Sequence, residues 1–449
     1  MFRRLFCAAI AVFCLAQPPL ADEAGLARQA QAAFAAGQVE LARMLALAVL
    51  DGDSRDPTAL AVLAAVGLAT HEPEAAREVA GRSFGEAADD RGRFTAARLA
   101  ARASVDLEEF GVAKYWLRRA VQVAPDEAAK AATVRDFLAV RALSPLRLDF
   151  GLSIKPSDNV NQGSEDSLLT VDGNPTWFYF DPSSLALPGV EATANLALRY
   201  RIASDAGATT EIGFRGSHRA VALSDEAKAL APGAKGEDFA TSAFDLFVQQ
   251  RRELSPEMVL IGGLTFGKTW LAGMPYADRA RMELALGTRH GANDQSRLGL
   301  SVERQWLESG RPQATSVSLD AGWQHRLAGG DLVALRLEMG QTVSDDPNQE
   351  NRKLGASLRY ALADPVAGAT VSAALNVTAR DYPVFFNGIF NDTGREDLSV
   401  SMNIDLALPR LGAFGFEPVV SLEASRTESN VSRYSGEAVG IGLRIQSSF

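Results

Sequence analysis

The chain is nearly devoid of the residues that most often carry chemistry. Its only cysteines are Cys7 and Cys14, and no nucleophile elbow, phosphate-binding loop or zinc motif occurs. The four histidines are far apart and show no metal-ligand spacing, at His71, His218, His290 and His325. The sequence therefore predicts no enzyme, no cofactor and no metal site. The many carboxylates leave open one exception, a buried acidic pair of the kind a barrel protease or phospholipase uses.

Long hydrophobic runs are also missing beyond the N-terminus. Arg3 and Arg4 precede an apolar run from Leu5 to Leu15, and Ala21 offers a cleavage site, so residues 1–21 have the form of an export signal. Removing it would remove both cysteines and exclude disulfide chemistry. No later stretch reaches the ~18 apolar residues of a spanning helix. An exported chain of this kind can still cross a membrane as a β-barrel.

Basic residues are outnumbered by acidic ones, 45 to 55, which gives a formal net charge of −10. Loss of Arg3 and Arg4 with the signal lowers it to about −12. This balance argues against a nucleic-acid partner.

What the chain does contain is alternation of apolar and polar residues, in fourteen successive stretches of residues 146–449. In the first stretch one face carries Leu146, Leu148, Phe150, Leu152 and Ile154, with polar residues or glycine between them. A strand whose two faces meet different solvents alternates apolar and polar residues in this way. About 9 to 11 residues of a tilted strand span a bilayer. A soluble β-sandwich would also alternate. The export signal, the connections and the final strand favour a transmembrane barrel.

The connections alternate between long polar loops and short turns. The long ones fall at residues 156–189, 223–237, 269–278, 307–313, 344–351, 382–395 and 427–436. The short ones hold turn-forming residues, at 205–207, 255–256, 291–293, 328–330, 364–365 and 409–412. Fourteen antiparallel strands follow, with both barrel ends on the periplasmic side.

The final strand ends on an aromatic residue. Val439, Ile441, Leu443, Ile445 and Phe449 share one face. A lipid-facing terminal Phe449 resembles the assembly signal that the outer-membrane barrel insertion machinery reads, so this machinery is an expected partner.

Residues 22–145 have a different character, rich in alanine with apolar residues at helical spacing. Ala42, Ala76 and Ala113 occupy equivalent places in similar segments, at spacings of 34 and 37. The third segment resembles the second half of a tetratricopeptide repeat, where small residues let two helices approach closely. A plain alanine-rich bundle is the alternative. The predicted fold is thus a tetratricopeptide-like periplasmic helical domain, residues 22–145, followed by a 14-stranded antiparallel outer-membrane β-barrel, residues 146–449.

The inner faces of the predicted strands are strongly charged. By parity the residues that point into the lumen include Arg199, Arg201, Arg281, Glu283, Arg336, Glu338 and Arg444. They could simply be solvated or paired groups that fill a barrel of this size. They could also line a polar conduit through which an unfolded polypeptide slides.

The first long loop begins with a distinctive segment, KPSDNVNQ at residues 155–162. Asn159 and Asn161 either form an Asx-rich turn or mark a family motif. Together with the export signal, the short helical domain and the fourteen-stranded barrel, this segment resembles the Slam family of surface lipoprotein assembly modifiers. The resemblance covers essentially the whole mature chain, although the repeats here are degenerate and the helical domain is short.

The resemblance implies a Gram-negative outer-membrane translocator that delivers lipoproteins, or related secreted haem- or metal-acquisition proteins, from the periplasm to the surface. Its partners would be that cargo and the outer-membrane lipids. No catalytic residues carry over. A polysaccharide exporter that joins tetratricopeptide repeats to a barrel is the leading alternative, and a passive porin is another.

A lipid-anchored cargo would leave a charged lumen most easily through the side of the barrel. The first and last strands are the expected seam, with Gly151 on one side and Gly440 and Gly442 on the other. Glycine weakens strands and contributes no cross-strand packing. Ordinary curvature at barrel glycines is the alternative.

Overall fold

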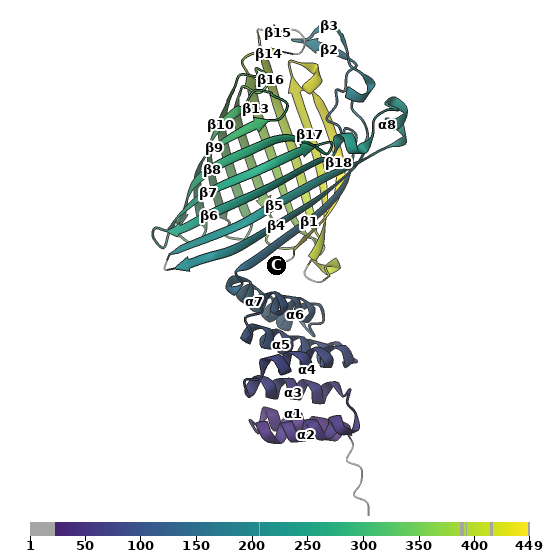
Figure 1. The fold of residues 1–449 in the computed structure, drawn as a ribbon, viewed down its shortest axis with the longest axis vertical. Helices are drawn as coiled ribbons and strands as arrows, with labels where there is room; N and C mark the ends of the chain where they lie inside the picture. The colour runs from purple at the N-terminus through teal and green to yellow at the C-terminus, as the bar shows by residue number, and fades with distance from the viewer. Residues whose placement is uncertain (1–22, 206, 387–389, 392, 414–415, 448–449) are drawn as a thin grey trace, which may run out of the picture. The chain divides into compact units, whose positions relative to one another are not determined.

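The computed structural model describes residues 23–447, with gaps at 206, 387–389, 392 and 414–415. The chain forms two compact units that divide between Leu143 and Ser144. The first unit is helical and the second is built mainly from strands (Figure 1). The expected export signal, residues 1–21, and the expected assembly signal Phe449 lie outside the described residues.

The helices form where alanine-rich sequence, which has high helix propensity, follows a capping residue. The Asp56 carboxylate accepts a hydrogen bond from the Ala59 N–H at 2.7 Å, and the Asp89 carboxylate accepts one from Gly92 at 2.7 Å. The helices of this unit are α1 (Glu23–Ala35), α2 (Val39–Gly52), α3 (Pro57–Ala69), α4 (Pro73–Glu86), α5 (Asp90–Asp106), α6 (Phe110–Gln122) and α7 (Glu127–Leu143).

The three repeated alanines lie in every second helix. Ala42 belongs to α2, Ala76 to α4 and Ala113 to α6, and none is more than 1% exposed. A Cβ added to Gly67 of α3 would lie 3.2 Å from the Cβ of Ala76, so α3 and α4 leave no room for larger side chains. The predicted tetratricopeptide-like helical domain is confirmed. Within the described residues, no helix has both the length and the apolar character needed to cross a membrane.

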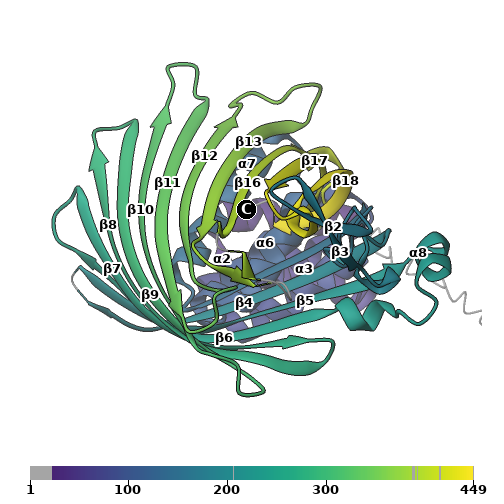
Figure 2. The same ribbon diagram turned by 90° about the horizontal axis from the view of Figure 1, so that it is seen from above.

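The second unit is a closed barrel of fourteen strands, which confirms the predicted fold class (Figure 2). All neighbouring strands are antiparallel, and the last strand meets the first. The barrel strands are β1 (Leu146–Ser157), β4 (Gly189–Asp205), β5 (Ala208–Leu223), β6 (Thr241–Glu253), β7 (Met258–Leu271), β8 (Met274–His290), β9 (Asp294–Leu307), β10 (Ala314–Arg326), β11 (Leu332–Ser344), β12 (Asn351–Ala361), β13 (Thr370–Tyr382), β16 (Arg395–Ala407), β17 (Phe416–Ser429) and β18 (Gly436–Ser447).

One predicted long connection, residues 269–278, is wrong. Strands β7 and β8 continue through this segment and are joined by a tight turn at Ala272 and Gly273, whose φ angles are +52° and +74°. Two left-handed central residues are typical of a two-residue hairpin. The apolar alternation stops earlier because Lys268 and Asp278 form an ion pair of 3.0 Å across the two strands. The strands stay paired beyond this ion pair, past a register shift between Thr269 and Trp270, as far as Leu271 and Met274.

Other connections contain elements that the sequence did not predict. The first loop holds a hairpin of β2 (Leu168–Val171) and β3 (Asn174–Tyr179), then a short 3-10 helix, η1 (Pro182–Ser184). The remaining short elements are α8 (Asp225–Leu230), η2 (Gly236–Phe239), β14 (Phe385–Phe386), β15 (Phe390–Asn391), η3 (Pro409–Leu411) and η4 (Ser432–Tyr434). Except for η3, which lies in the turn between β16 and β17, these elements belong to connections on the same side of the barrel as the first loop. The seven connections on that side define the loop end, and the other side is the turn end.

The two faces of the barrel wall differ in chemistry. One face exposes large apolar side chains, including Val439 at 77% and Ile441 at 61%. The residues between them along β18 are small or polar. An apolar band of this extent is stable against lipid rather than water, so we assign it to the outer face and the charged face to the lumen.

Close packing at Ala76 provides a test of the helical unit. Ala76→Leu should destabilise it by about 1–3 kcal/mol because the buried site cannot hold a longer side chain. Ala75→Leu, at the exposed neighbouring position, is the matched control and should change stability by less than about 0.5 kcal/mol. Thermal loss of the helical circular dichroism signal of the full-length protein measures both. Equal melting of the two variants would contradict the close approach of α3 and α4.

Candidate functional site

The charged residues predicted to face the lumen share one face of the barrel wall. Cross-strand register places Arg281 opposite Glu303, and Glu338 opposite Asp320. Ion pairs on this face join Arg281 to Glu283 and Glu303, Arg297 to Glu283 and Asp320, Arg336 to Asp320, and Lys353 to Glu338. The three arginines are 37–54% exposed. Each such pair contributes about 0–1 kcal/mol. The face is therefore polar and hydrated, and its side chains are not fixed in one arrangement.

Some pairs on this face reach over an intervening strand. Arg279 of β8 binds Asp245 of β6 at 2.7 Å, above Gly267 of β7. A Cβ on Gly267 would lie 2.1 Å from an Asp245 carboxylate oxygen, so glycine is required there. Arg444 of β18 similarly reaches Asp405 of β16 at 2.8 Å.

Arg199 and Arg201 lie toward the turn end, near the start of β1. Arg199 approaches Asp149 at 3.9 Å. The Arg201 guanidinium donates to the Ser144 carbonyl at 3.2 Å, and its backbone N–H donates to the Pro145 carbonyl at 2.9 Å. Arg201 therefore holds the backbone that leads into the first strand.

The predicted seam, between β1 and β18, is the weakest point of the barrel's backbone ladder. Among the described residues, its register contains three residue pairs, Leu152–Ile445, Ser153–Arg444 and Ile154–Leu443. On its other side β1 pairs with β4 along its full length, from Leu146–Tyr200 to Ser157–Gly189. Few backbone hydrogen bonds thus need to break to separate β1 from β18.

Proline and glycine account for part of this shortness. The Pro156 carbonyl faces β18, 3.4 Å from where a Cβ on Gly440 would lie. In a strand the N–H of a residue points to the same side as its carbonyl, so proline removes a donor from the seam. A Cβ on Gly442 would lie 3.4 Å from that of Lys155. Lys155, rather than Gly151, thus lies beside these glycines; Gly151 lies against Asn195 of β4.

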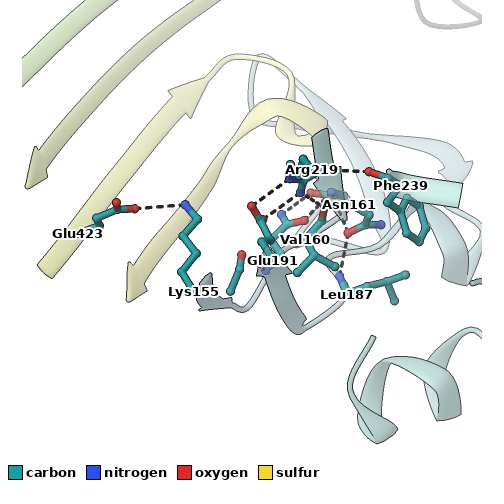
Figure 3. A network of polar contacts seen from close by, with 11 residues as sticks. Lys155, Val160, Asn161, Leu187, Glu191, Arg219, Phe239 and Glu423 are labelled. Atoms are coloured by element: carbon teal, nitrogen blue, oxygen red, sulfur yellow. Dashed lines mark hydrogen bonds and ion pairs between the residues drawn. The ribbon is translucent and has the colours of Figure 1, made fainter. Parts of the chain in front are cut away.

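A side-chain contact spans β18 where the glycines leave room. The Lys155 ammonium group lies 3.2 Å from the Glu423 carboxylate of β17 (Figure 3). Glu423 is the cross-strand partner of Gly440. Both side chains are more than 40% exposed, so this tie is weak.

At the loop end, residues 162–172 of the first loop cross to residues 430–437, and we call this contact the loop strap. It includes a bridge between Val171 and Val431. Its hydrogen bonds run from Asp172 N to Asn430 O (2.8 Å), Asn430 Nδ2 to Asp172 Oδ1 (3.0 Å), Thr170 N to Ser432 Oγ (3.0 Å), Arg433 Nη1 to Gln162 O (2.8 Å) and Glu437 N to Glu165 Oε1 (2.6 Å). The strap closes the seam where the strand ladder does not.

One carboxylate makes the strap sensitive to acid. Hydrogen bonds from Asn430, and then from Thr393, hold the pKa of Asp172 below its ordinary value. A lowered pKa means that the folded state prefers the charged form. The contribution of Asp172 is therefore present above the ordinary aspartate pKa and is lost as pH falls through the lowered one.

Asn159 and Asn161 hold the first loop together. Asn161 Nδ2 donates to the Leu185 carbonyl at 2.7 Å, and Asn161 Oδ1 accepts from the Leu187 N–H at 2.9 Å (Figure 3). Asn159 exchanges two hydrogen bonds with the Gly163 backbone, at 2.7 and 2.9 Å. The segment is thus an Asx-based clasp, which the sequence offered as one of two readings.

An arginine that the sequence did not single out supports this clasp. Arg219 of β5 pairs with Glu191 of β4 at 2.9 Å and donates to the carbonyls of Val160 and Phe239 (Figure 3). The Arg219 and Glu191 side chains are only 20% and 12% exposed. Val160, whose carbonyl Arg219 binds, and Leu187, whose carbonyl accepts from the Val160 N–H, are both fully buried. Its only signal in the sequence was two opposite charges on neighbouring strands.

A second arginine organises the aromatic loop after β13. The Arg395 guanidinium lies 3.7 Å from the ring centroids of Tyr382 and Tyr434 and 4.9 Å from that of Phe385. It also pairs with Asp397 at 3.1 Å. Tyr382 and Phe385 are buried. These aromatics therefore pack the loop end instead of forming a free surface.

The histidines do not assemble a catalytic site. His325 contacts Asp294 at 2.8 Å, and His218 contacts Ser242 at 2.9 Å, each on its own pair of strands. In the part of the chain that the structure describes, no group of three or more His, Cys, Asp or Glu residues is arranged to hold a metal ion.

No known protein-family model matches the chain, and neither does any curated protein. Among solved structures, the first tetratricopeptide domain of the human RPAP3 protein is 16% identical and covers 27% of this chain and 92% of that one, with a TM-score of 0.24. Outer-membrane expressed OmpT of Vibrio cholerae is 10% identical and covers 67% and 97%, with a TM-score of 0.34. An outer membrane channel from Pseudomonas putida F1 is 12% identical and covers 67% and 94%, with a TM-score of 0.34. These likenesses concern the fold alone.

The clasp can be tested by one isosteric change. Asn161→Asp replaces two donated hydrogen bonds with a carboxylate facing the carbonyls of Ser183 and Leu185, which should cost about 1–3 kcal/mol locally. Limited proteolysis should then cut the first loop faster. Asn293→Asp, in an exposed turn at the turn end, adds the same charge without that effect. Unchanged cleavage in Asn161→Asp would show that the clasp does not order the loop.

Proposed function

We propose that this protein is an outer-membrane translocator that delivers lipoproteins, or related secreted haem- or metal-acquisition proteins, from the periplasm to the cell surface. The observation that carries the proposal is the seam between β1 and β18. A closed barrel in which one strand pair is joined at three positions among the described residues offers a lateral exit that a passive pore does not need. The resemblance to the Slam family supports the same reading.

The lumen face suits a polypeptide in transit. Its ion pairs are exposed and individually weak, and large apolar side chains lie mainly on the opposite face. An extended chain meets polar groups that exchange partners readily. The acyl chains of a lipid anchor are poorly accommodated there. Separation of β1 from β18 would let the anchor pass sideways into lipid while the polypeptide leaves through the lumen.

The loop strap is the proposed latch of this exit. Its hydrogen bonds connect the first loop to the last one, on the two sides of the seam. The strap lies at the loop end of the barrel. We assign the opposite, turn end to the periplasm because barrel proteins place their short turns there. The strap would then face the cell exterior.

The helical unit is the proposed receptor for cargo. Stacked helix pairs of the tetratricopeptide type present a groove suited to extended peptides. The chain passes from α7 to β1 within a few residues, because α7 ends at Leu143 and β1 begins at Leu146. Captured cargo would therefore be tethered close, in sequence, to the first barrel strand.

A disulfide across the seam tests the exit. The register pairs Ser153 with Arg444, so Ser153→Cys with Arg444→Cys should cross-link and reduce surface display of a co-expressed, epitope-tagged lipoprotein to background. Ser153→Cys with Thr193→Cys is the matched control, because it joins β1 to β4 across a continuous ladder. Flow cytometry of intact cells measures display, and a reductant should restore it.

Both outcomes of this experiment are informative. Because both native cysteines lie in the expected signal, no background disulfides arise. Full display through a barrel that is quantitatively cross-linked at 153 and 444 would rule out the lateral exit. Loss of display in the β1–β4 control as well would assign the defect to general stiffening of the barrel.

Deletion of residues 22–143 tests the receptor role separately. The barrel should still insert and show heat-modifiable migration, because it is a compact unit of its own. Cargo display should fall to background. Full display without the helical unit would show that it is not the receptor, whereas failure to insert would assign it a role in assembly.

A further inference from the structure

The outer face of the barrel is hollowed near its loop end by a groove of about 970 Å³. The groove extends from β10 across β11, β12, β13 and β16 to the end of β17, and its lining includes Asn430 of the loop strap. Its deeper part is lined by Met339, Leu354, Ala379 and Leu398. Its upper part is lined by polar residues that include Arg352, Asp381 and Glu396. No seam or strap contact described above uses the side chains of these seven residues.

Strand register explains both parts. Met339, Leu354, Ala379 and Leu398 are successive cross-strand neighbours, so they form one row on a single face. Ala379 is the one small side chain in that row and leaves a notch between two leucines. The adjacent row toward the loop end consists of Gln341, Arg352, Asp381 and Glu396. An apolar notch therefore ends directly at a charged row.

These rows face the bilayer rather than the lumen. Lys353 lies between Arg352 and Leu354 in β12, and its side chain reaches Glu338 at 2.8 Å on the inner face. Side chains alternate along a strand, so Arg352 and Leu354 point outward. The charged row marks the height at which lipid head groups begin.

The charged row is electrostatically incomplete. Asp381 and Glu396 are direct cross-strand partners, and like charges at such positions repel. Arg352 is the cross-strand partner of Asp381 on the other side. Within the described residues, the side chains of these three residues form no hydrogen bond or ion pair with one another or with other groups. The row offers one free cation next to two free carboxylates.

We propose that this groove binds a phospholipid with a primary amine in its head group. The phosphate would lie on Arg352, and the ammonium group would donate hydrogen bonds to Asp381 and Glu396. Cross-strand neighbours stand about 4.5–5.5 Å apart, a spacing that a phosphate and an amine two carbons away can match. One acyl chain would fill the notch at Ala379.

The binding preference can be measured by native mass spectrometry of the full-length protein in detergent. Equal amounts of phosphatidylethanolamine, phosphatidylcholine and phosphatidylglycerol are added together. The ethanolamine lipid should be retained roughly tenfold over either competitor, since the choline lipid cannot donate hydrogen bonds and the glycerol lipid has no cation. The double variant Asp381→Asn, Glu396→Gln should lose this preference.

A second variant separates the notch from the head-group row. Ala379→Leu fills the groove and should lower retention of all three lipids. Ala321→Leu is the matched control, because Ala321 is also exposed and lies on the same outer face but does not line the groove. Heat-modifiable migration verifies that each barrel is folded. Equal retention of the three lipids, or retention insensitive to Ala379→Leu, would overturn the proposal. Magnesium-dependent retention of lipid A without an ethanolamine preference would overturn it in favour of a phosphorylated glycolipid.

Discussion

Closure of the backbone hydrogen-bond ladder is the constraint on which the rest of this structure depends. A strand in lipid has no water to satisfy its N–H and carbonyl groups, so every strand needs a partner on both sides. In the described part of the chain, thirteen of the fourteen junctions satisfy this need with long antiparallel registers, whereas the junction of β1 and β18 has three residue pairs. Other contacts add to the pairing at that junction.

Those contacts lie at the rim or on the inner face, and they are polar except for a buried apolar cluster of Leu169, Phe385 and Val431. The loop strap joins segments more than 250 residues apart in sequence, and Lys155 reaches Glu423 over the glycines of β18. Hydrogen bonds to solvated groups are individually weak. A junction that depends on them can open without disturbing the continuous ladders elsewhere. The contrast between the continuous strand pairings and the short β1–β18 pairing is the physical basis of the proposed lateral exit.

The helical unit depends on a different constraint, the close approach of helices through alanine. Ala42, Ala76 and Ala113 are buried without carrying large apolar side chains. Packing of this kind gains less hydrophobic free energy per residue than a leucine core, and it tolerates little increase in volume. The regular spacing of the three alanines follows from that intolerance.

The sequence by itself determined the fold class, because the signals involved are local. The period of two along each strand and the recurrence of alanine can both be recognised without knowing which residues are in contact in the folded protein. It failed at residues 269–278, where the Lys268–Asp278 pair broke the apolar pattern while the strands continued. The clasp at Asn159 and Asn161 was open to two readings until its backbone partners were known.

Only the tertiary structure decided which residues meet across the seam, how the loops close it and where the outer groove lies. Register between the first and last strands is set by closure of the whole barrel, so Lys155 rather than Gly151 came to lie beside Gly442. The registers between neighbouring strands β12, β13 and β16 aligned Ala379 with two leucines and Asp381 with Glu396. The alternation of apolar and polar residues does not encode the pairing at the seam, because that pairing depends on the tilt and stagger of every strand between β1 and β18.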